Sequence, residues 1–178
     1  MTNYKIRATS TEIYVAGNST NLFKSTDNGS SWITYSINNP GIFPNLNYCM
    51  DVAGSTIVVA GETGNLHKST DNGSNWLDLA DWVTYAGFIN SIYVENSTGK
   101  MIAAGRYDSN PGCIIYSNNG GNTWQASPAT TPFDYMLNRM QMFDNNNGYF
   151  AGDGGYFAKT TDGGMSLSPL IIPFAGIN

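Results

Sequence analysis

The residues best suited to chemistry in this chain are its arginines. A guanidinium group can bind a carboxylate through two parallel hydrogen bonds, which an ammonium group cannot do. The three arginines are Arg7, Arg106 and Arg139, and they could in principle converge on one carboxylate-bearing ligand. Glutamate is scarce, because the chain contains only Glu12, Glu62 and Glu95.

Other reactive side chains are isolated from one another in the sequence. His67 occupies the position that Phe23 and Ile115 hold in related segments, so we interpret it as a packed histidine. Cys49 and Cys113 are predicted to be buried free thiols that act as small apolar residues. No cysteines and histidines have the spacing of a zinc site, and the Asp-Asn-Gly turns lack the further ligands of a calcium loop. We therefore expect no metal and no cofactor.

Composition and charge exclude several classes of function. The net charge is −5 and the eight basic residues are scattered, so no basic stripe is available to a nucleic-acid backbone. No apolar run is long enough to cross a bilayer, and the amino terminus lacks an apolar signal segment. Charged residues make up only 12% of the chain. A polar, uncharged surface of this kind is common in virion and extracellular proteins, and we expect a virion or surface-appendage setting.

A repeated phrase indicates which elements position these side chains. Residues 25–32 read STDNGSSW, and residues 69–76 read STDNGSNW. Residues 117–124 (SNNGGNTW) and 160–167 (TTDGGMSL) are weaker copies. Successive copies lie about 45 residues apart, which is a period typical of propellers and solenoids.

Each copy follows a short apolar segment that ends in Ala-Gly. These segments, at residues 13–17, 57–61, 101–105 and 148–152, advance along the chain together with the repeated phrase. Each unit divides into four short runs rich in β-branched and aromatic residues, separated by Gly, Asn and Ser. The sequence therefore predicts an all-β chain of about four units, each a four-stranded antiparallel sheet.

The residue types within the repeated phrase predict a tight turn. Its Asp can accept hydrogen bonds from backbone N–H groups, and its Gly supplies a positive φ. Its Trp begins the next strand and can fill the seam between neighbouring sheets. The residues assigned to these structural roles are Ser25, Asp27, Gly29, Trp32, Ser69, Asp71, Gly73, Trp76, Ser117, Asn119, Gly121, Trp124, Thr160, Asp162 and Gly164.

The repeated phrase resembles the Asp-box, or BNR repeat, Ser-x-Asp-x-Gly-x-x-Trp, of sialidases, sortilin-type receptors and photosystem II assembly-factor-like proteins. The resemblance implies a β-propeller in which each box joins the third and fourth strands of a blade, away from the active centre. We expect one domain over residues 1–178, with blades at about 4–36, 48–80, 89–128 and 139–173. A closed four-bladed ring is favoured over an open arc or a ring shared between chains.

Long connectors on the loop-rich face of such a propeller are the expected place for a binding site. The candidate binding residues are Trp82, Tyr85, Arg106, Tyr107 and Asp108. Aromatic rings beside charges suit a sugar or a protein contact, whereas the alternative is that these rings cap the core. We expect an interaction scaffold with a protein or glycan partner, and a homo-oligomer is one option. A carbohydrate-binding module is an alternative.

The same resemblance raises the alternative of a sialidase-like glycoside hydrolase or a fragment of one. Such enzymes hold the substrate carboxylate with three arginines and use a Tyr–Glu pair and an acidic proton donor. Arg7 falls in an innermost strand, Arg139 at the approach to another, and Arg106 in an upper turn. The Arg-Ile-Pro sequence of that family is missing, because Ala8 and Thr9 follow Arg7. From this departure and the small number of blades, we predict that the protein is not an enzyme.

Overall fold

Four antiparallel sheets of four strands each make up the described part of the chain, for which we have a computed structural model. The structure describes residues 5–17, 20–37, 47–62, 65–79, 87–107, 110–129 and 135–172. Within these ranges the helical structure is limited to the short 3₁₀ turn η3 (Asp153–Gly155). None of the helical structure described there is long and apolar enough to cross a membrane. The predicted all-β class is confirmed.

Each sheet is formed by four strands that follow one another in the chain. The first sheet contains β1 (Lys5–Ala8), β2 (Ile13–Ala16), β3 (Asn21–Ser25) and β4 (Ile33–Ser36). The second contains β5 (Asn47–Ala53), β6 (Thr56–Gly61), β7 (Leu66–Ser69) and β8 (Leu77–Asp78). The third contains β9 (Phe88–Val94), β10 (Met101–Tyr107), β11 (Asn110–Ser117) and β12 (Gln125–Ala126). The fourth contains β13 (Leu137–Met142), β14 (Gly148–Gly152), β15 (Phe157–Thr160) and β16 (Ser168–Pro169).

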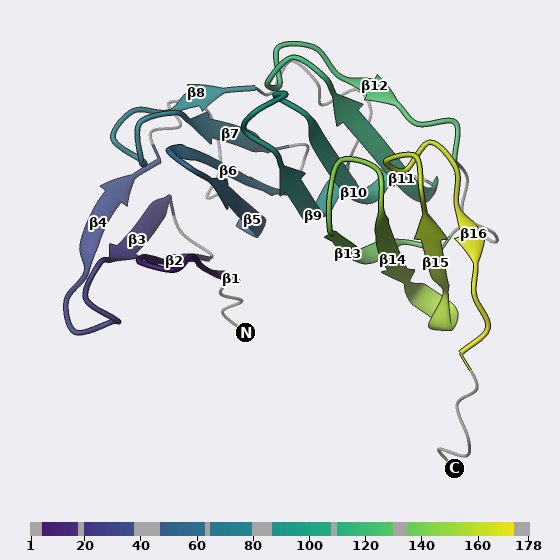
Figure 1. Cartoon of the computed structure of the whole chain (residues 1–178), viewed down its shortest axis with the longest axis horizontal. Helices are drawn as coiled ribbons and strands as arrows, with labels where there is room; N and C mark the ends of the chain where they lie inside the picture. Colours follow the sequence, from purple (N-terminus) through teal and green to yellow (C-terminus); the bar gives the residue numbers. More distant parts are fainter. Residues whose placement is uncertain are drawn as a thin grey trace.

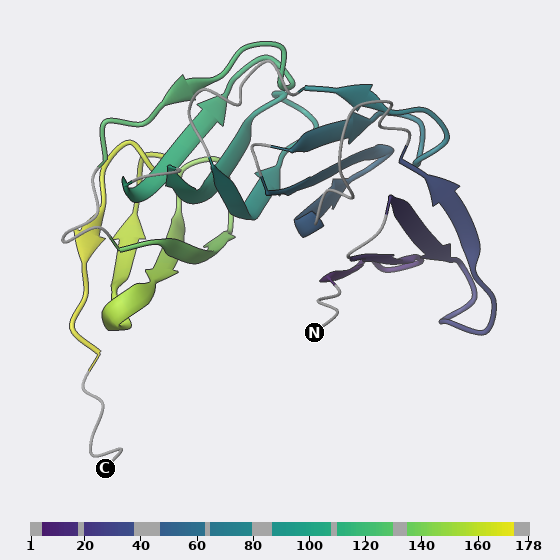
Figure 2. The same ribbon diagram turned by 180° about the vertical axis from the view of Figure 1, so that it is seen from behind.

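The four sheets stand side by side along an open arc (Figures 1 and 2). The first strands of the sheets, β1, β5, β9 and β13, line the inner side of the arc, and each contacts the next. The last strands, β4, β8, β12 and β16, lie on its outer side. Among the described residues, no strand of the first sheet pairs with a strand of the fourth, and the two sheets stand apart in both views.

The structure corrects the expectation of a closed ring, because the arc is open. The apolar clusters join consecutive sheets only, among the residues that the structure describes. Every described strand already belongs to the sheet of its own unit, so no strand is left to link the first sheet to the fourth. Interlocking side chains set the angle between neighbouring sheets, and at this angle four sheets do not complete a full turn.

Three apolar clusters hold the sheets together, one in each seam between consecutive sheets. The middle sheets are therefore covered on both faces, and β6 is buried along its whole length. In contrast, three of the four residues of β1 are exposed. The seams contain, in chain order, Tyr14, Leu22 and Val59; Val58, Leu66, Ala103 and Ile115; and Ile102, Ile114, Phe150 and Ala158.

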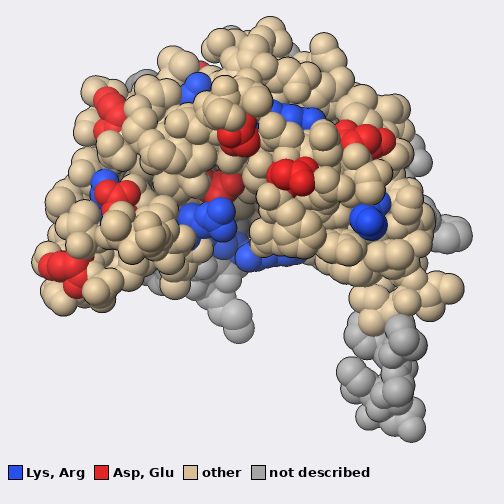
Figure 3. Space-filling view, viewed as in Figure 1, with Lys and Arg blue, Asp and Glu red and all other residues tan. Residues whose placement is uncertain are grey.

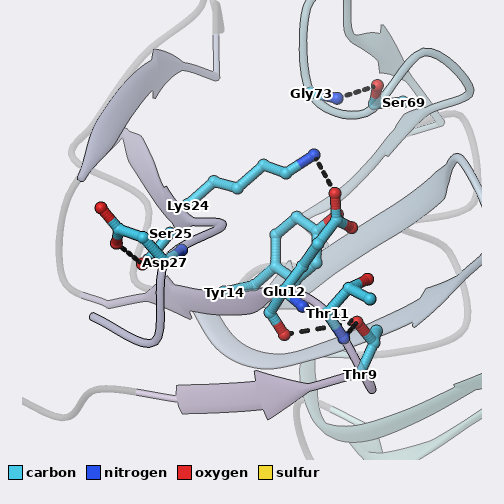
Figure 4. Close-up of polar contacts among 9 residues, drawn as sticks. All are labelled: Thr9, Thr11, Glu12, Tyr14, Lys24, Ser25, Asp27, Ser69 and Gly73. Carbon is cyan, nitrogen blue, oxygen red and sulfur yellow. Dashed lines mark hydrogen bonds and ion pairs between the residues drawn. The ribbon is translucent and has the colours of Figure 1, made fainter. Parts of the chain in front are cut away.

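Every copy of the repeated phrase forms a hydrogen-bonded turn between the third and fourth strands of its sheet. In the second sheet, the backbone N–H of Gly73 donates to Ser69 Oγ (2.8 Å), and Ser69 Oγ donates to Asp71 Oδ1 (2.8 Å). Asp71 Oδ1 also accepts from the backbone N–H of Asn75 (2.8 Å). Gly73 has a φ of 94°, which a residue with a side chain resists. Figure 4 shows the Ser69–Gly73 bond together with the Ser25–Asp27 bond of the first turn.

Candidate functional site

The inner side of the arc carries a pocket of about 350 Å³ that is lined by strands of all four sheets. Successive side chains of a strand point to opposite faces, so each inner strand directs only part of its residues towards the hollow. The polar side chains of the lining include Lys5, Arg7, Asp51, Asn90, Arg139 and Gln141. We take this pocket as the candidate functional site and call it the inner pocket.

Arg7 and Asp51 form an ion pair between the first and second sheets. Nε of Arg7 lies 2.8 Å from Oδ1 of Asp51, and the two side chains are 45% and 7% exposed. Oδ2 of Asp51 accepts a hydrogen bond of 2.9 Å from the backbone N–H of Val94 on β9. Burial raises the pKa of Asp51, although the Val94 N–H and the Arg7 charge act in the opposite direction. The carboxylate thus joins three sheets, while the Arg7 side chain, which lines the pocket, remains partly exposed.

The inner pocket is basic although the chain as a whole is acidic. Lys5 and Arg7 on β1 and Arg139 on β13 line it, together with the single carboxylate of Asp51. The chain carries a net charge of −5. Figure 3 shows Lys and Arg atoms gathered at the hollow side of the arc, with Asp and Glu atoms spread more widely over this face. A cleft lined by one sign of charge attracts ligands of the opposite sign, so this pocket favours an anionic ligand.

Hydrogen bonds between β9 and β13 make the walls of the pocket rigid. Ser91 Oγ accepts from the backbone N–H of Met140 (3.0 Å) and donates to the Met140 carbonyl oxygen (3.2 Å). Nδ2 of Asn90 donates to the Leu137 carbonyl oxygen (3.0 Å). These side chains tie β9 to β13, so this part of the pocket wall is held in place by the fold itself. Such preorganisation lowers the entropy cost of binding.

The structure brings together two of the three arginines noted in the sequence. Arg7 and Arg139 both line the inner pocket. Arg106 does not, because its guanidinium lies over the ring of Phe88, 4.4 Å from the ring centre. The predicted binding residues Trp82, Tyr85 and Asp108 lie outside the described residues, and of Tyr107 only the backbone in β10 is described. That predicted surface therefore stays a prediction.

Sequence reasoning missed Lys5 and Asp51 as members of the site. A signal for Asp51 was present in the repeat, because Arg7 and Asp51 pair with the equivalent residues Tyr14 and Val58 of the next strand. Lys5 and Arg139 are likewise equivalent, since each pairs with the alanine of an Ala-Gly segment. Aligning the first strands by these partners would have placed the charged side chains at matching positions around the inner side.

A second charged cluster, formed by Glu12, Tyr14 and Lys24, lies within the first sheet (Figure 4). Nζ of Lys24 lies 2.7 Å from Oε1 of Glu12, and the Tyr14 hydroxyl donates to Oε2. Hydrogen bonds from Lys24 and Tyr14 lower the pKa of Glu12. Burial opposes the charge of Lys24, but the bonds to Glu12 and Tyr14 raise its pKa. The three groups satisfy one another outside the inner pocket, so we assign this cluster a structural role.

The histidine and the cysteines are packed within the sheets. His67 is 2% exposed, and burial lowers its pKa, which favours the neutral ring although Asp78 lies 3.7 Å away. Cys49 and Cys113 are buried free thiols, and burial raises the pKa of Cys113 to about 12. Over the described ranges, no three residues of the types His, Cys, Asp and Glu are grouped as metal ligands.

Comparisons with known proteins place the fold. No family model matches the sequence, and no curated protein matches it. A solved structure of YCF48 bound to a D1 peptide is 18% identical with a TM-score of 0.62, covering 96% of this chain and 55% of that one. A GH74 xyloglucanase from Xanthomonas campestris is 13% identical with a TM-score of 0.67, covering 94% of this chain and 30% of that one. A mutant of Trypanosoma rangeli sialidase with trans-sialidase activity is 13% identical with a TM-score of 0.64, covering 93% and 36%.

The fold is that of the Asp-box β-propellers. The resemblance inferred from the repeated phrase is thereby confirmed, and the four sheets are propeller blades. This propeller chain spans little more than half the length of the YCF48 chain and about a third of the two enzyme chains.

The prediction that the chain is not an enzyme requires correction. The propellers it resembles include a xyloglucanase and a sialidase with trans-sialidase activity. The prediction relied on the missing Arg-Ile-Pro sequence and on the number of blades, which are features of one enzyme family only. At 13% identity the likeness concerns the fold alone, and this propeller fold does not separate the chain from enzymes.

Proposed function

We propose that this propeller is an interaction scaffold whose inner pocket binds an acidic, extended segment of a partner protein. The observation that carries the proposal is the gathering of Lys5, Arg7 and Arg139 around one pocket of about 350 Å³. Pockets of about 300 to 1,000 Å³ are typical of ligand sites, and the lower end of this range suits one or two side chains. The YCF48 structure contains a bound D1 peptide, which supports a peptide as the kind of ligand.

The pocket offers both arginines for the carboxylate of an acidic peptide and apolar side chains for its aliphatic part. Arg7 is oriented by its ion pair with Asp51, whereas Arg139 is an exposed residue of β13 that lines the pocket. A carboxylate side chain or a carboxyl terminus would be held between them by charge-assisted hydrogen bonds. Met50 and Met142 also line the pocket, and their flexible apolar side chains would pack against the aliphatic part of the peptide.

The experiment uses two labelled peptides of equal length, one rich in Glu and one with Gln at the same positions. We expect the Glu peptide to bind in a fluorescence anisotropy titration and the Gln peptide to bind at least about tenfold more weakly, because charge-assisted bonds are lost. Arg139→Gln should lower the affinity for the Glu peptide to a similar degree. Lys159→Gln is the matched control, because Lys159 is an exposed cation of the same sheet outside the pocket lining. Equal affinity for both peptides, or full affinity in Arg139→Gln, contradicts the proposal.

A second candidate ligand, favoured by the placement of Arg7 and Arg139 in one pocket, is a sugar that carries a carboxylate. The similar structures include a sialidase by its printed name. Turnover of a fluorogenic sialoside that disappears in Arg139→Gln would identify a sialidase-like hydrolase. Saturable binding of sialyllactose without turnover would identify a carbohydrate-binding module instead. If the parent chain shows neither turnover of the sialoside nor binding of sialyllactose, this candidate is ruled out.

The loop surface predicted from sequence remains a separate proposal, with Trp82, Tyr85, Arg106, Tyr107 and Asp108 as its residues. Because Arg106 stacks on Phe88 away from the inner pocket, Arg106→Ala discriminates between the two surfaces. Loss of Glu-peptide binding in Arg106→Ala with full binding in Arg139→Gln would assign the peptide to the loop surface. We also propose a virion or cell-surface appendage as the setting, from the charge-poor composition.

A further inference from the structure

Each seam within the arc is built from the same positions of the repeat. We call the face of a sheet that packs on the following sheet its leading face, and the opposite face its trailing face. The leading-face residues three positions before the glycine of Ala-Gly are all 0% exposed, namely Tyr14, Val58 and Ile102. The trailing-face residues one position later are at most 1% exposed, namely Val59, Ala103 and Phe150.

The leading face of the fourth sheet carries three aromatic rings beside Lys159, and no sheet follows it among the residues that the structure describes. Tyr149 stands at the position of Tyr14 in the repeat, and Phe157 stands at a position that is buried leucine or isoleucine in the other three sheets. The rings of Tyr149 and Phe157 stack with centres 5.3 Å apart, and Phe143 meets Tyr149 edge-on at 5.7 Å. Phe143 is 67% exposed. These rings form the apolar half of a seam without its other half.

No sheet precedes the trailing face of the first sheet within the described part of the chain. Ile6, Val15 and Phe23 form a cross-strand row on this face, since Val15 pairs with Ile6 on β1 and with Phe23 on β3. Ile6 is 70% exposed, and Val15 and Phe23 are only half-buried. The residues equivalent to Val15 in the other sheets are at most 1% exposed. This row is therefore the other half of the same kind of seam.

The first box turn shows the same missing neighbour. A Cβ on Gly73 would lie 3.2 Å from Leu22 Cδ2 of the preceding sheet, whereas a Cβ on Gly29 would contact only Trp32 of its own turn, at 3.7 Å. Trp32 is 44% exposed, while the equivalent Trp124 is 4% exposed in the seam with the second sheet. The box of the first sheet thus has the residues that pack on a preceding sheet, but no such sheet among the described residues.

We infer that the leading face of the fourth sheet binds the trailing face of the first sheet of a second copy of this chain. Continuity with the three seams of the arc argues for this occupant, because each chain carries both halves of that repeated interface. The contact is head-to-tail, and such contacts form a ring when the rotation closes. Two copies of four sheets each give eight blades, which lies at the upper end of the usual range for propellers.

The test measures the mass of the chain by light scattering and mass photometry from low to high micromolar concentration. We expect a dimer, and we expect Ile6→Asp and Phe143→Asp each to raise its dissociation constant by at least about tenfold, as for a buried apolar interface residue. Both side chains are largely exposed in the single chain, so circular dichroism should show intact folding. Leu77→Asp is the matched control, because Leu77 is 57% exposed on β8 away from both terminal faces. If an Asp variant does not fold, Ile6→Ser or Phe143→Ser replaces it in the same measurement.

Mixing the two variants tests the head-to-tail direction. Each variant keeps one intact face, so Ile6→Asp and Phe143→Asp should be monomeric alone and form a one-to-one heterodimer when mixed. If the parent chain stays monomeric, the inference is overturned, and the two faces would then bind another partner or further blades. A dimer that survives both substitutions, or that responds to Phe143→Asp alone, also overturns it.

Discussion

At the scale of single residues, the hydroxyl group that opens each box turn joins the carboxylate or amide side chain of the turn to the turn's backbone. Ser69 Oγ donates to Asp71 Oδ1 and accepts from the backbone N–H groups of Gly73 and Asp71. Ser69 is 1% exposed, so water cannot replace these bonds. Thr160 makes the same bonds in the fourth turn, which indicates that the hydroxyl group and not the residue type is required.

Ser69→Ala should therefore destabilise the fold. It leaves the N–H of Gly73 buried without an acceptor, at a cost of about 1–3 kcal/mol in the free energy of unfolding. Ser69→Thr should cost much less, because Thr160 shows that the turn accepts a β-branched hydroxyl residue. Urea unfolding measures both, with Ser74→Ala at an exposed position of the same turn as the control. A Ser69→Ala variant as stable as Ser74→Ala would contradict the assigned role.

The carboxylate of the first box should make stability depend on acid pH. Hydrogen bonds from the side chain and backbone of Ser31 lower the pKa of Asp27 from 3.8 to about 2. Between these values the unfolded chain binds more protons than the folded chain, so stability falls as pH falls. The contribution of Asp27 is complete above the unfolded value and is lost as pH approaches about 2. Urea unfolding at a series of pH values should show a shallower decline for Asp27→Asn, and an unchanged decline would refute the assignment.

At the scale of the elements, the box turns of the second, third and fourth sheets each pack on the sheet that precedes them. A Cβ on Gly121 would lie 2.9 Å from Leu79 Cδ1 of the second sheet and 3.4 Å from Met101 Sδ. Gly29, with a nearly identical φ of 89° against 86°, has no preceding sheet beside it among the described residues. The two glycines thus differ in inter-sheet packing and not in backbone conformation.

This pair of glycines separates the cost of backbone strain from the cost of packing. Gly29→Ala should destabilise by about 1–2 kcal/mol through the left-handed conformation alone. Gly121→Ala should cost about 1–3 kcal/mol more, because the added methyl overpacks the second seam. Thermal and urea unfolding at low protein concentration measure both values, since association would involve the first box. Equal costs would show that the box turn does not hold neighbouring sheets together.

The sequence predicted the strands and turns correctly, but it did not predict how the four sheets are arranged relative to one another. The Ala-Gly segments fall at the ends of β2, β6 and β14 and within β10, and the box phrases fall after the third strands, because both patterns are local. The inner pocket depends on which first strands become neighbours, so Asp51 is recognised as part of it only when the first strands of the repeats are aligned with one another. Ring closure depends on the angle between sheets, which many seam residues determine together. The closed ring was therefore the part that the sequence could not supply.

At the scale of the whole molecule, the arc resembles a repeat protein with two open ends. Stability in such a molecule is approximately a sum of the intrinsic stabilities of its units and the interfaces between neighbours. The second and third sheets each have two seams, whereas the first and fourth each have one among the described residues. The first sheet has the weaker cover of the two, since β1 is exposed at three of its four residues.

Hydrogen exchange should therefore show a gradient along the arc. Amides of β6 and β10, in the sheets with two seams, should be the most protected, and amides of β1 and β2 should exchange fastest among the strands. Exchange followed by mass spectrometry at low protein concentration measures the single chain.

Raising the concentration should slow exchange in the first and fourth sheets while leaving β6 and β10 unchanged, because head-to-tail contact covers only the terminal faces. Leu77→Asp should keep this concentration dependence and Phe143→Asp should abolish it. Uniform protection across all four sheets would contradict the repeat-like view of the arc.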